Sequence, residues 1–414
     1  MKRSTIILLF TGIIIITGCR NAVNEKSKNS QDMTRDSLSL YGNNRDFIKK
    51  YVPVIELRRD NSAIVLVPAW QGRVMTSTSE GENGYSFGWV NRGLISSGKI
   101  LSHINAFGGE ERLWLGPEGG QFSIFFRKGA EFTFERWQTP AFIDTMPYEV
   151  LASSDTSALF RIKTGIENYS GTRFDLTINR KVTLLSETDL KTMTGISVQG
   201  LSSVAYHSEN SITNSGKNEW KKENGLLSLW MLGMYNPSPA VVVVIPVKEG
   251  DESSLGKRIN DNYFGSISPD RLKVEGNLIF FRADGKSRGK IGVPPLRAEN
   301  VMGSFDSQNN ILTLLFCKLP VGITEYVNSA WQIQENPFSG DAFNSYNDGP
   351  LEDGSQMGPF YELETSSPAA ALAPGGTLTH NQITVHLTGD RRLLDEVSIK
   401  ILGVSLEKIE TVFR

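Results

Sequence analysis

The fold is decided by the stretch Gly358-Pro-Phe-Tyr-Glu-Leu-Glu-Thr-Ser-Ser-Pro368. The turn-forming run Ala-Leu-Ala-Pro-Gly-Gly follows it at 371–376. Apolar and acidic side chains alternate in the first stretch, and successive side chains of a strand point to opposite faces of a sheet. If Leu363 faces a core, Glu362 and Glu364 lie together on the other face. That face is either solvated or part of a cleft. The stretch therefore predicts a strand with two carboxylates on one side.

The rest of the chain repeats this strand pattern. Short runs rich in β-branched and aromatic residues, several with a two-residue period, are separated by Gly, Asn, Asp and Pro. One helix is expected near the end, capped by Asp390 and ended by Gly403. The sequence predicts an all-β, large antiparallel fold with a short C-terminal helix. Strands are expected at 64–68, 73–78, 121–126, 148–152, 159–166, 174–182, 241–247, 277–283, 311–319, 331–334 and 382–387.

A second stretch, from His103 to Gly120, combines two Gly-Gly pairs with charged residues and a tryptophan. Glycines let the backbone turn sharply or approach a ligand. An exposed Trp114 would offer a flat face to a sugar ring, while carboxylates and Arg form directional hydrogen bonds with hydroxyls. The alternative is a tight turn with Glu–Arg pairs and Trp114 in the core. The candidate substrate-binding residues are His103, Glu110, Arg112, Trp114, Glu118 and Glu362.

Both stretches resemble signatures of the galactose mutarotase (aldose 1-epimerase) superfamily. Near its C-terminus that superfamily has a strand glutamate, a Pro/Ala-rich turn, a Leu-x-Pro-Gly loop and a last strand. Glu364, Pro368-Ala-Ala370, Leu372-Ala-Pro-Gly375 and 383–387 stand here in that order. The earlier segment is matched by Gly108-Gly109, Leu113-Trp114 and Pro117-Glu118.

The resemblance implies a galactose mutarotase-like β-supersandwich over 46–390, a C-terminal helical segment over 391–414 packed on it, and a cleft that holds a sugar. The whole chain looks similar to an uncharacterised group of bacterial lipoproteins with this domain. In family enzymes a glutamate removes the proton of the anomeric hydroxyl and a histidine protonates the ring oxygen, so the ring opens and recloses.

The resemblance assigns the base role to Glu364 and, at a plausible position with different flanking residues, the acid role to His207. Phe107 stands where the family has a substrate-binding histidine, and His103 lies four residues upstream. The implied activity is aldose 1-epimerase-like. Glycan binding without catalysis, and a structural or interaction role on the same scaffold, remain as alternatives.

The first 45 residues predict a lipid anchor. Lys2 and Arg3 precede an apolar run that is too short to span a membrane but typical of a secretory signal. The run ends in Ile16-Thr-Gly-Cys19, which resembles the bacterial lipobox. We expect a signal peptide over 1–18, acyl chains such as palmitate on Cys19, and a flexible tether over 19–45. The alternative is a cleaved signal with an incidental cysteine. The expected location is the cell envelope, at the outer membrane if the organism has one.

Charge and cysteine content exclude several classes. The 43 basic and 45 acidic residues give a net charge of −2, which argues against nucleic acid as a partner. Once Cys19 is lipidated, Cys317 is left alone, so no internal disulfide is expected. No cofactor is expected, although the loop at 341–353 offers oxygen ligands for Ca²⁺ near Asp348. A polar surface loop is the alternative there.

Overall fold

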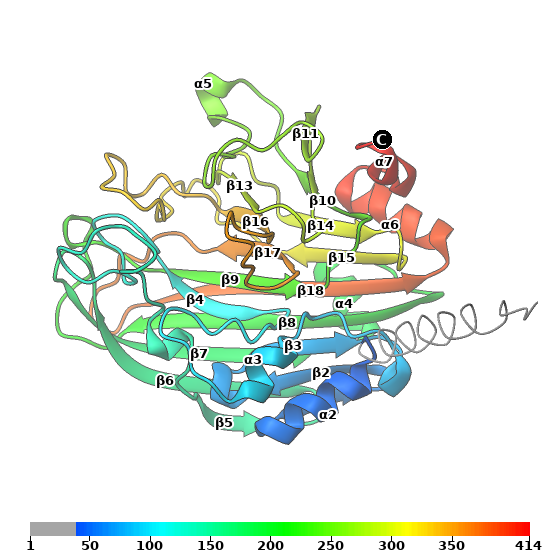
Figure 1. Ribbon diagram of the computed structural model, residues 1–414, viewed down its shortest axis with the longest axis horizontal. Helices are drawn as coiled ribbons and strands as arrows, with labels where there is room; N and C mark the ends of the chain where they lie inside the picture. The colour runs from blue at the N-terminus through cyan, green and yellow to red at the C-terminus, as the bar shows by residue number, and fades with distance from the viewer. Residues whose placement is uncertain (1–38) are drawn as a thin grey trace, which may run out of the picture.

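The computed structural model describes residues 39–414 and shows two layers of antiparallel β-sheet packed face to face (Figure 1). The first layer is a ten-stranded sheet with the long strands in its middle. Its strands, in spatial order, are β11 (Leu272–Glu275), β12 (Leu278–Arg282), β10 (Val241–Pro246), β14 (Val301–Asp306), β15 (Ile311–Phe316), β18 (Thr377–Gly389), β8 (Leu201–Asn214), β7 (Arg173–Leu184), β6 (Ser157–Glu167) and β5 (Glu149–Ser153).

The second layer consists of a five-stranded sheet and a three-stranded sheet that continues it. Backbone hydrogen bonds of 3.1 and 3.2 Å between Val74 and Glu111 join the two sheets. The five strands, in order, are β13 (Gly289–Val293), β16 (Phe343–Asn347), β17 (Tyr361–Ser366), β9 (Ser228–Tyr235) and β4 (Arg112–Gly116), and the three are β1 (Ile55–Arg59), β2 (Ser62–Val67) and β3 (Arg73–Thr78).

The apolar core lies between the layers. Leu113 and Met231 of the five-stranded sheet belong to one buried cluster with Ile178 and Val204 of the large sheet. Leu363 belongs to a neighbouring buried cluster, together with side chains of β10 and β15. Burying each such side chain contributes roughly 1.5–3 kcal/mol. The inner face of the five-stranded sheet is thereby used for stability, which leaves its outer face available for a site.

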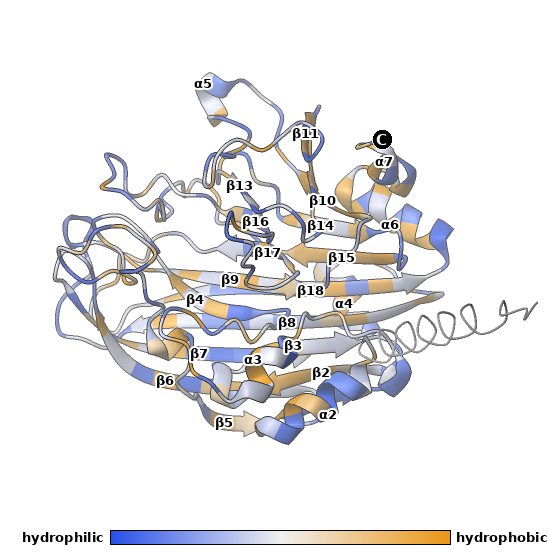
Figure 2. Cartoon of the chain, viewed as in Figure 1, coloured by the Kyte–Doolittle hydropathy of each residue, from blue (hydrophilic) through white to orange (hydrophobic). Residues whose placement is uncertain are grey.

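Helices cover the outer faces of both layers. Helices α4, α6 and α7 pack an apolar cluster against the large sheet, and α2 packs on the three-stranded sheet. Figure 2 shows hydrophilic and hydrophobic residues side by side on α2 and α6, as in amphipathic helices on a sheet surface. The helices are α2 (Tyr41–Tyr51), α3 (Arg92–Ser97), α4 (Glu187–Thr194), α5 (Glu252–Leu255), α6 (Arg391–Leu402) and α7 (Leu406–Thr411), with short 3₁₀ turns η1 (Pro68–Trp70), η2 (Gly81–Asn83), η3 (Ala141–Ile143) and η4 (Lys222–Asn224).

The predicted all-β, antiparallel fold with a C-terminal helix is confirmed. Asp390 caps α6 by accepting a 3.1 Å hydrogen bond from the Leu393 amide, and Gly403 ends it in the left-handed conformation. A cap of this kind contributes about 1 kcal/mol. Nine of the eleven expected strands coincide with strands of the structure.

The strands expected at 121–126 and 331–334 are wrong, because both segments are loops. Ile124, Phe125 and Phe126 are buried in succession, which a strand with one solvated face would not allow. High β-propensity here reflects aromatic packing rather than sheet pairing.

The described fold begins before residue 46. Helix α2 starts at Tyr41, inside the segment expected to be a tether, and buries Tyr41 and Ile48 against the three-stranded sheet. The expected signal peptide and Cys19 lie outside the described residues. Across 39–414, no helix combines the length and the hydropathy needed to cross a bilayer.

Candidate functional site

The candidate site lies on the outer face of the five-stranded sheet. The register places Asn344, Glu364, Leu232 and Arg112 side by side across β16, β17, β9 and β4. Glu362 lies two residues before Glu364 in β17, so its side chain is on the same face of the sheet. The alternating stretch thus forms the expected strand, with Leu363 fully buried in the core and both glutamates on the opposite face.

Glu364 is fully buried and held at one oxygen only. Its Oε2 accepts a 2.8 Å hydrogen bond from the indole of Trp230 and a 2.9 Å hydrogen bond from the ammonium of Lys290. Lys290 also lies 4.7 Å from the centre of the Trp230 ring. Its Oε1 has no hydrogen-bond partner within residues 39–414. The carboxylate is therefore oriented by the protein at one oxygen, while the other is buried on the outer-face side without a partner among the described residues.

Glu362 forms a buried ion pair with Arg112. Burial raises the pKa of Glu362, Arg112 opposes this, and the neighbouring Glu364 adds to it. The guanidinium of Arg112 lies 5.0 Å from the centre of the Trp114 ring. Its Nε has no partner in the described part of the chain. Arg112 therefore has a donor left for a ligand even while it is paired with Glu362.

Glu118, at the end of β4, adds a third acid. Its amide donates a 3.1 Å hydrogen bond to Ser329, and its carboxyl is hydrogen-bonded by Trp331. Burial raises the pKa of Glu118 to about 7; the charge of Lys290 lowers it and that of Glu364 raises it further. At neutral pH about half of the Glu118 side chains hold a proton, because the pKa and the pH coincide. The site therefore combines a proton donor with the oriented carboxylate of Glu364.

Asp341 lies near Lys290, whose charge favours the ionised form of its carboxyl. Asn260 donates a 3.1 Å hydrogen bond to its Oδ2, and the hydroxyl of Tyr263 donates to the same atom. Burial raises the pKa of Asp341 to about 6, against the effect of these hydrogen bonds. A Cβ on Gly292 would lie only 2.1 Å from Asp341 Oδ2, so this close approach requires glycine.

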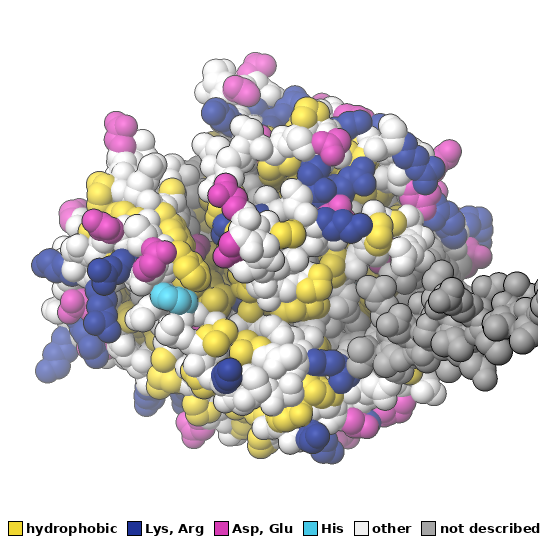
Figure 3. Space-filling model, in the orientation of Figure 1, with side chains coloured by type: hydrophobic (Ala, Val, Ile, Leu, Met, Phe, Trp, Pro, Cys, Tyr) yellow, Lys and Arg dark blue, Asp and Glu magenta, His cyan; other side chains and the backbone are white. Residues whose placement is uncertain are grey.

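The predicted residues Glu362, Glu364, Arg112, Glu118 and Trp114 are brought together. Trp114 lies on the site face but is only 4 % exposed, edge-on to Trp230 at 5.7 Å. Its packing matches the core alternative, with one edge facing the site. Figure 3 shows this side of the molecule hollowed beside the loops that follow β4, with hydrophobic side chains along one wall.

His103 lies at the rim of this region. Its Nδ1 is 2.6 Å from the carbonyl oxygen of Trp137, and its ring is 4.8 Å from that of Phe134. Trp137 in turn stands between Trp114 and Trp331. His103 is therefore separated from the acidic cluster by a layer of aromatic rings.

His207 lies on the far side of the molecule. On β8, Tyr206 and Ser208 are buried toward the other layer, so His207 points to the outer face of the large sheet. There its Nε2 is 3.0 Å from Asn381 of β18. The structure does not bring the expected acid, His207, into one site with Glu364.

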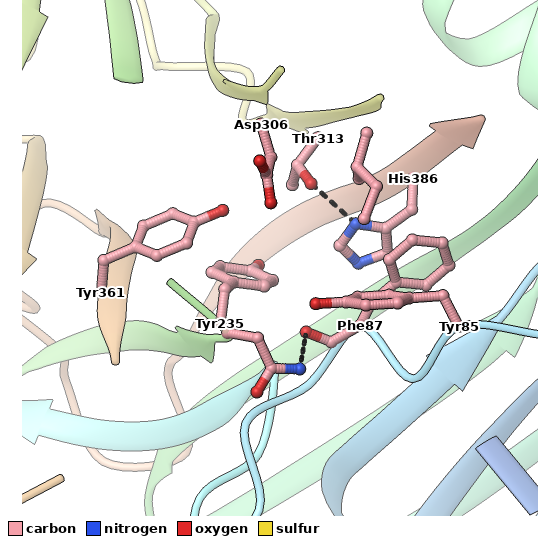
Figure 4. Close-up of a pocket in the computed structure, with 9 residues that line it drawn as sticks. Tyr85, Phe87, Tyr235, Asp306, Thr313, Tyr361 and His386 are labelled. Carbon is pink, nitrogen blue, oxygen red and sulfur yellow. Dashed lines mark hydrogen bonds between the residues drawn. The ribbon is translucent and has the colours of Figure 1, made fainter. Parts of the chain in front are cut away.

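Glu110 also lies away from the site, between the two layers. Its Oε2 is 3.5 Å from Nε2 of His386, whose Nδ1 is 2.9 Å from the hydroxyl of Thr313. Figure 4 shows His386 beside a buried cavity of about 10 Å³, which Tyr235 and Tyr361 also line. Such a volume has room for about one water molecule. Glu110 is therefore an interior acid that a sugar could not reach.

Asp348 uses both carboxylate oxygens within the protein. Tyr346 donates a 2.7 Å hydrogen bond to Oδ1, and the amide of Gly358 donates a 3.0 Å hydrogen bond to Oδ2. Asn344 and Asn347, which were expected in a loop, belong to β16. Among the described residues, no group of three or more His, Cys, Asp or Glu side chains could hold a metal ion.

Several residues of the site escape sequence reasoning. Lys290, Trp230, Tyr263 and Trp331 come from segments with no motif, and Asp341 appears only as part of a polar loop. Trp230 lies within the apolar run of β9, where no polar residue marks it as part of a site. Only the pairing of β9, β13 and β16 with β17 brings them together.

Comparison with solved structures places the fold. Slr1438 from Synechocystis sp. PCC 6803 matches with a TM-score of 0.50 at 12% identity, over 82% of this chain and 96% of that one. A putative aldose 1-epimerase from Escherichia coli K12 matches with 0.48 at 10% identity (82% and 99% covered). A galactose mutarotase-like protein from Lactobacillus casei ATCC 334 matches with 0.49 at 11% identity (81% and 100% covered). Likenesses at such low identity concern the fold alone.

No curated protein matches this sequence. One family model does match, over residues 39–413, and it is described as a family of unknown function (DUF6786). The match covers the whole described fold except its last residue. The chain therefore belongs to the family of unknown function DUF6786.

Proposed function

We propose that this protein binds a carbohydrate on the outer face of its five-stranded sheet, as a lipid-anchored protein of the bacterial envelope. The observation that carries the proposal is the state of Glu364: Trp230 and Lys290 hold one oxygen and leave the other without a partner among residues 39–414. A fully buried carboxylate oxygen without a hydrogen bond is costly, and a ligand hydroxyl would satisfy it.

The surrounding groups suit a sugar. Sugar hydroxyls both donate and accept hydrogen bonds, and the site offers the acceptors Glu364 and Asp341 together with the donors Arg112 and Lys290. The half-buried indole of Trp331 provides apolar surface for a ring face. The expected envelope location favours extracytoplasmic glycans as the source of the sugar.

The acids also support chemistry at the anomeric centre. Glu364 would remove the proton of the anomeric hydroxyl, the bond from C1 to the ring oxygen would break, and the ring oxygen would take a proton from Glu118. Because the pKa of Glu118 is raised to about 7, it can supply this proton at neutral pH. Lys290 is a poorer donor, since Glu364 and Glu118 raise its pKa. Glu118 thus takes the role that His207 cannot fill from the far side of the molecule.

A glycan array with the wild-type protein and Glu364→Gln tests the binding proposal. We expect the wild type to bind a set of glycans and Glu364→Gln to lose them, because the amide replaces an acceptor by a donor at one position. Glu209→Gln, an exposed change on the outer face of β8, is the matched control. A blank array, or equal binding by wild type and Glu364→Gln, would refute the proposal.

Polarimetry of freshly dissolved α-glucose and α-galactose tests the chemistry separately. An accelerated rotation change that is lost in both Glu364→Gln and Glu118→Gln supports the acid–base pair. Binding without acceleration would leave a glycan-binding protein and remove the epimerase activity for these two sugars.

A further inference from the structure

We propose that the site takes an oligosaccharide, with one sugar at Glu364 and the following sugars along an aromatic wall made by Trp331, Trp137 and Phe134. This inference rests on the proposed function, and it names the substrate class. The wall begins at the acidic cluster and ends at the surface.

Trp331 forms the inner end of the wall. Its side chain is hydrogen-bonded to Glu118, its ring stacks on Trp137 at 5.9 Å, and it forms a T-shaped contact with Phe126 at 5.1 Å. Because Trp331 is only half-buried, part of its ring stays accessible beside the proton donor. A half-exposed indole fixed on one face by another indole offers the kind of flat surface on which the apolar side of a sugar ring stacks.

Phe134 forms the outer end. Its ring stacks on Trp137, which also contacts Trp331; the ring centres of Phe134 and Trp137 are 6.0 Å apart and the interplanar angle is 20°. The side chain is 54% exposed, so much of its ring is accessible to a ligand. His103 lies beside it, with ring centres 4.8 Å apart, and adds a polar group at this end. Trp137 is only 5 % exposed and supports the wall from behind, so Trp331 and Phe134 are the rings that present surface to a ligand.

The wall is rigid although loops carry it. The side chain of Gln121 bonds the backbone of Gln334 twice: its Nε2 donates to the carbonyl oxygen at 2.8 Å and its Oε1 accepts from the amide at 2.9 Å, which joins the loop after β4 to the loop before β16. A Cβ on Gly119 would lie 2.4 Å from the carbonyl oxygen of Ala330, so the two loops are in direct contact. A preorganised surface of this kind loses little entropy when it binds an extended ligand.

The combination favours a glycan chain over a protein or a lipid. A single sugar would fill the space beside Glu364 and leave Phe134 unused. A lipid or protein surface would use the exposed apolar rim but would not need Glu118 and Glu364 at its inner end. Figure 3 shows hydrophobic side chains that continue into the hollow on this side of the molecule.

Isothermal titration calorimetry with paired ligands tests this inference. The ligands are glucose with maltotetraose and cellotetraose, galactose with galactotetraose, and N-acetylglucosamine with chitotetraose. For at least one pair, we expect the tetrasaccharide to bind the wild type about tenfold or more tightly than its monosaccharide, equivalent to about 1.4 kcal/mol. Phe134→Ala and Trp331→Ala should reduce the affinity for the tetrasaccharide to the level of the monosaccharide, whose own affinity should persist in Phe134→Ala.

Two further variants keep the test decisive. Tyr51→Ala removes an aromatic side chain of similar exposure from α2, far from the wall, and should leave both affinities unchanged. Trp331→Phe keeps a ring and should retain part of the tetrasaccharide preference, which separates stacking from misfolding.

The possible failures are distinguishable. If monosaccharide and tetrasaccharide bind equally and Phe134→Ala has no effect, the oligosaccharide inference is wrong while the proposed function stands. If no sugar of the panel binds, both are wrong for these sugars. Binding to phosphatidylcholine vesicles that is lost in Phe134→Ala, with sugar affinity unchanged, would identify the wall as a lipid contact and overturn the inference.

Discussion

The ammonium of Lys290 lies 2.9 Å from Oε2 of Glu364, and this pair is the electrostatic centre of the outer face of the five-stranded sheet. Glu364 is fully buried and the Lys290 side chain is 12% exposed, so water screens the pair only weakly. Each partner is needed to compensate the desolvation of the other. The pair therefore contributes to the stability of the fold and also holds the Glu364 carboxylate in its orientation within the site.

Lys290→Met should destabilise the protein by about 3 kcal/mol, because it leaves Glu364 buried without its cation. Urea unfolding at pH 7 measures the change. The double variant Lys290→Met, Glu364→Gln should recover much of the loss, since no uncompensated charge remains. Equal stabilities for the wild type and Lys290→Met would show that the pair carries no net energy.

Glu118 should make stability fall with rising pH. Its pKa is raised from 4.5 to about 7 in the folded protein. Between these values the folded state holds more protons than the unfolded state, so the free energy of unfolding decreases as the pH increases. Glu118→Gln mimics the protonated side chain, so it should match the wild type near pH 4. By pH 8 it should be the more stable of the two, by as much as about 3 kcal/mol.

Urea unfolding at several pH values measures this difference, with Glu209→Gln as the exposed control. A constant difference between Glu118→Gln and the wild type from pH 4 to pH 8 would contradict the assignment.

If Glu118 donates the proton to the ring oxygen, catalysis should decline as the pH rises past about 7. The reason is that the acid form of Glu118 is depleted above its pKa. Mutarotation rates corrected for the buffer reaction, followed by polarimetry from pH 5.5 to 8.5, measure the profile. A rate that stays level across this range would assign the proton to another group.

Gly292→Ala should disrupt the Asp341 side of the site, because its Cβ would stand 2.1 Å from Asp341 Oδ2. We expect a loss of about 1–3 kcal/mol in stability, as for other overpacked positions, and weaker sugar binding. Gly93→Ala in α3 is the control, since its nearest neighbour would lie at an ordinary 3.6 Å. Thermal unfolding and calorimetry measure both effects, and an unaltered Gly292→Ala protein would show that Asp341 moves freely.

His207→Ala should leave sugar binding and mutarotation unchanged, because His207 lies on the outer face of the large sheet. The expected change in stability is below about 0.5 kcal/mol, as for other surface positions. Glu364→Gln, measured in parallel, should lose binding. A large loss of activity in His207→Ala would require the two faces to communicate through the large sheet.

Short-range sequence patterns predict the regular strands and helices, whose side chains alternate or recur with a fixed period. The alternation around Leu363 identifies β17 and the shared face of its glutamates, and Asp390 with Gly403 identifies the ends of α6. Patterns fail where aromatic side chains pack without pairing, as at 121–126 and 331–334. In those loops burial is decided by contacts between segments distant in sequence, which propensity does not encode.

The site is predictable only in part for the same reason. Glu362, Glu364, Arg112 and Glu118 come from two recognisable motifs, and strand pairing brings them together. Glu110 stands in the same motif but points between the layers, and no local signal separates it from Glu118. Lys290 reaches Glu364 from β13, two strands away, so only the order of the sheet reveals it.

The two halves of the site are built on different kinds of backbone. Glu362 and Glu364 stand on β17, which is flanked on both sides by other strands, whereas Trp331 and Phe134 stand on loops. Substitutions, insertions and deletions are tolerated far better in loops than in a central strand. The acids can therefore stay fixed while the wall is rebuilt, so under the proposed function a change of preferred glycan would need new loops but no new acidic centre.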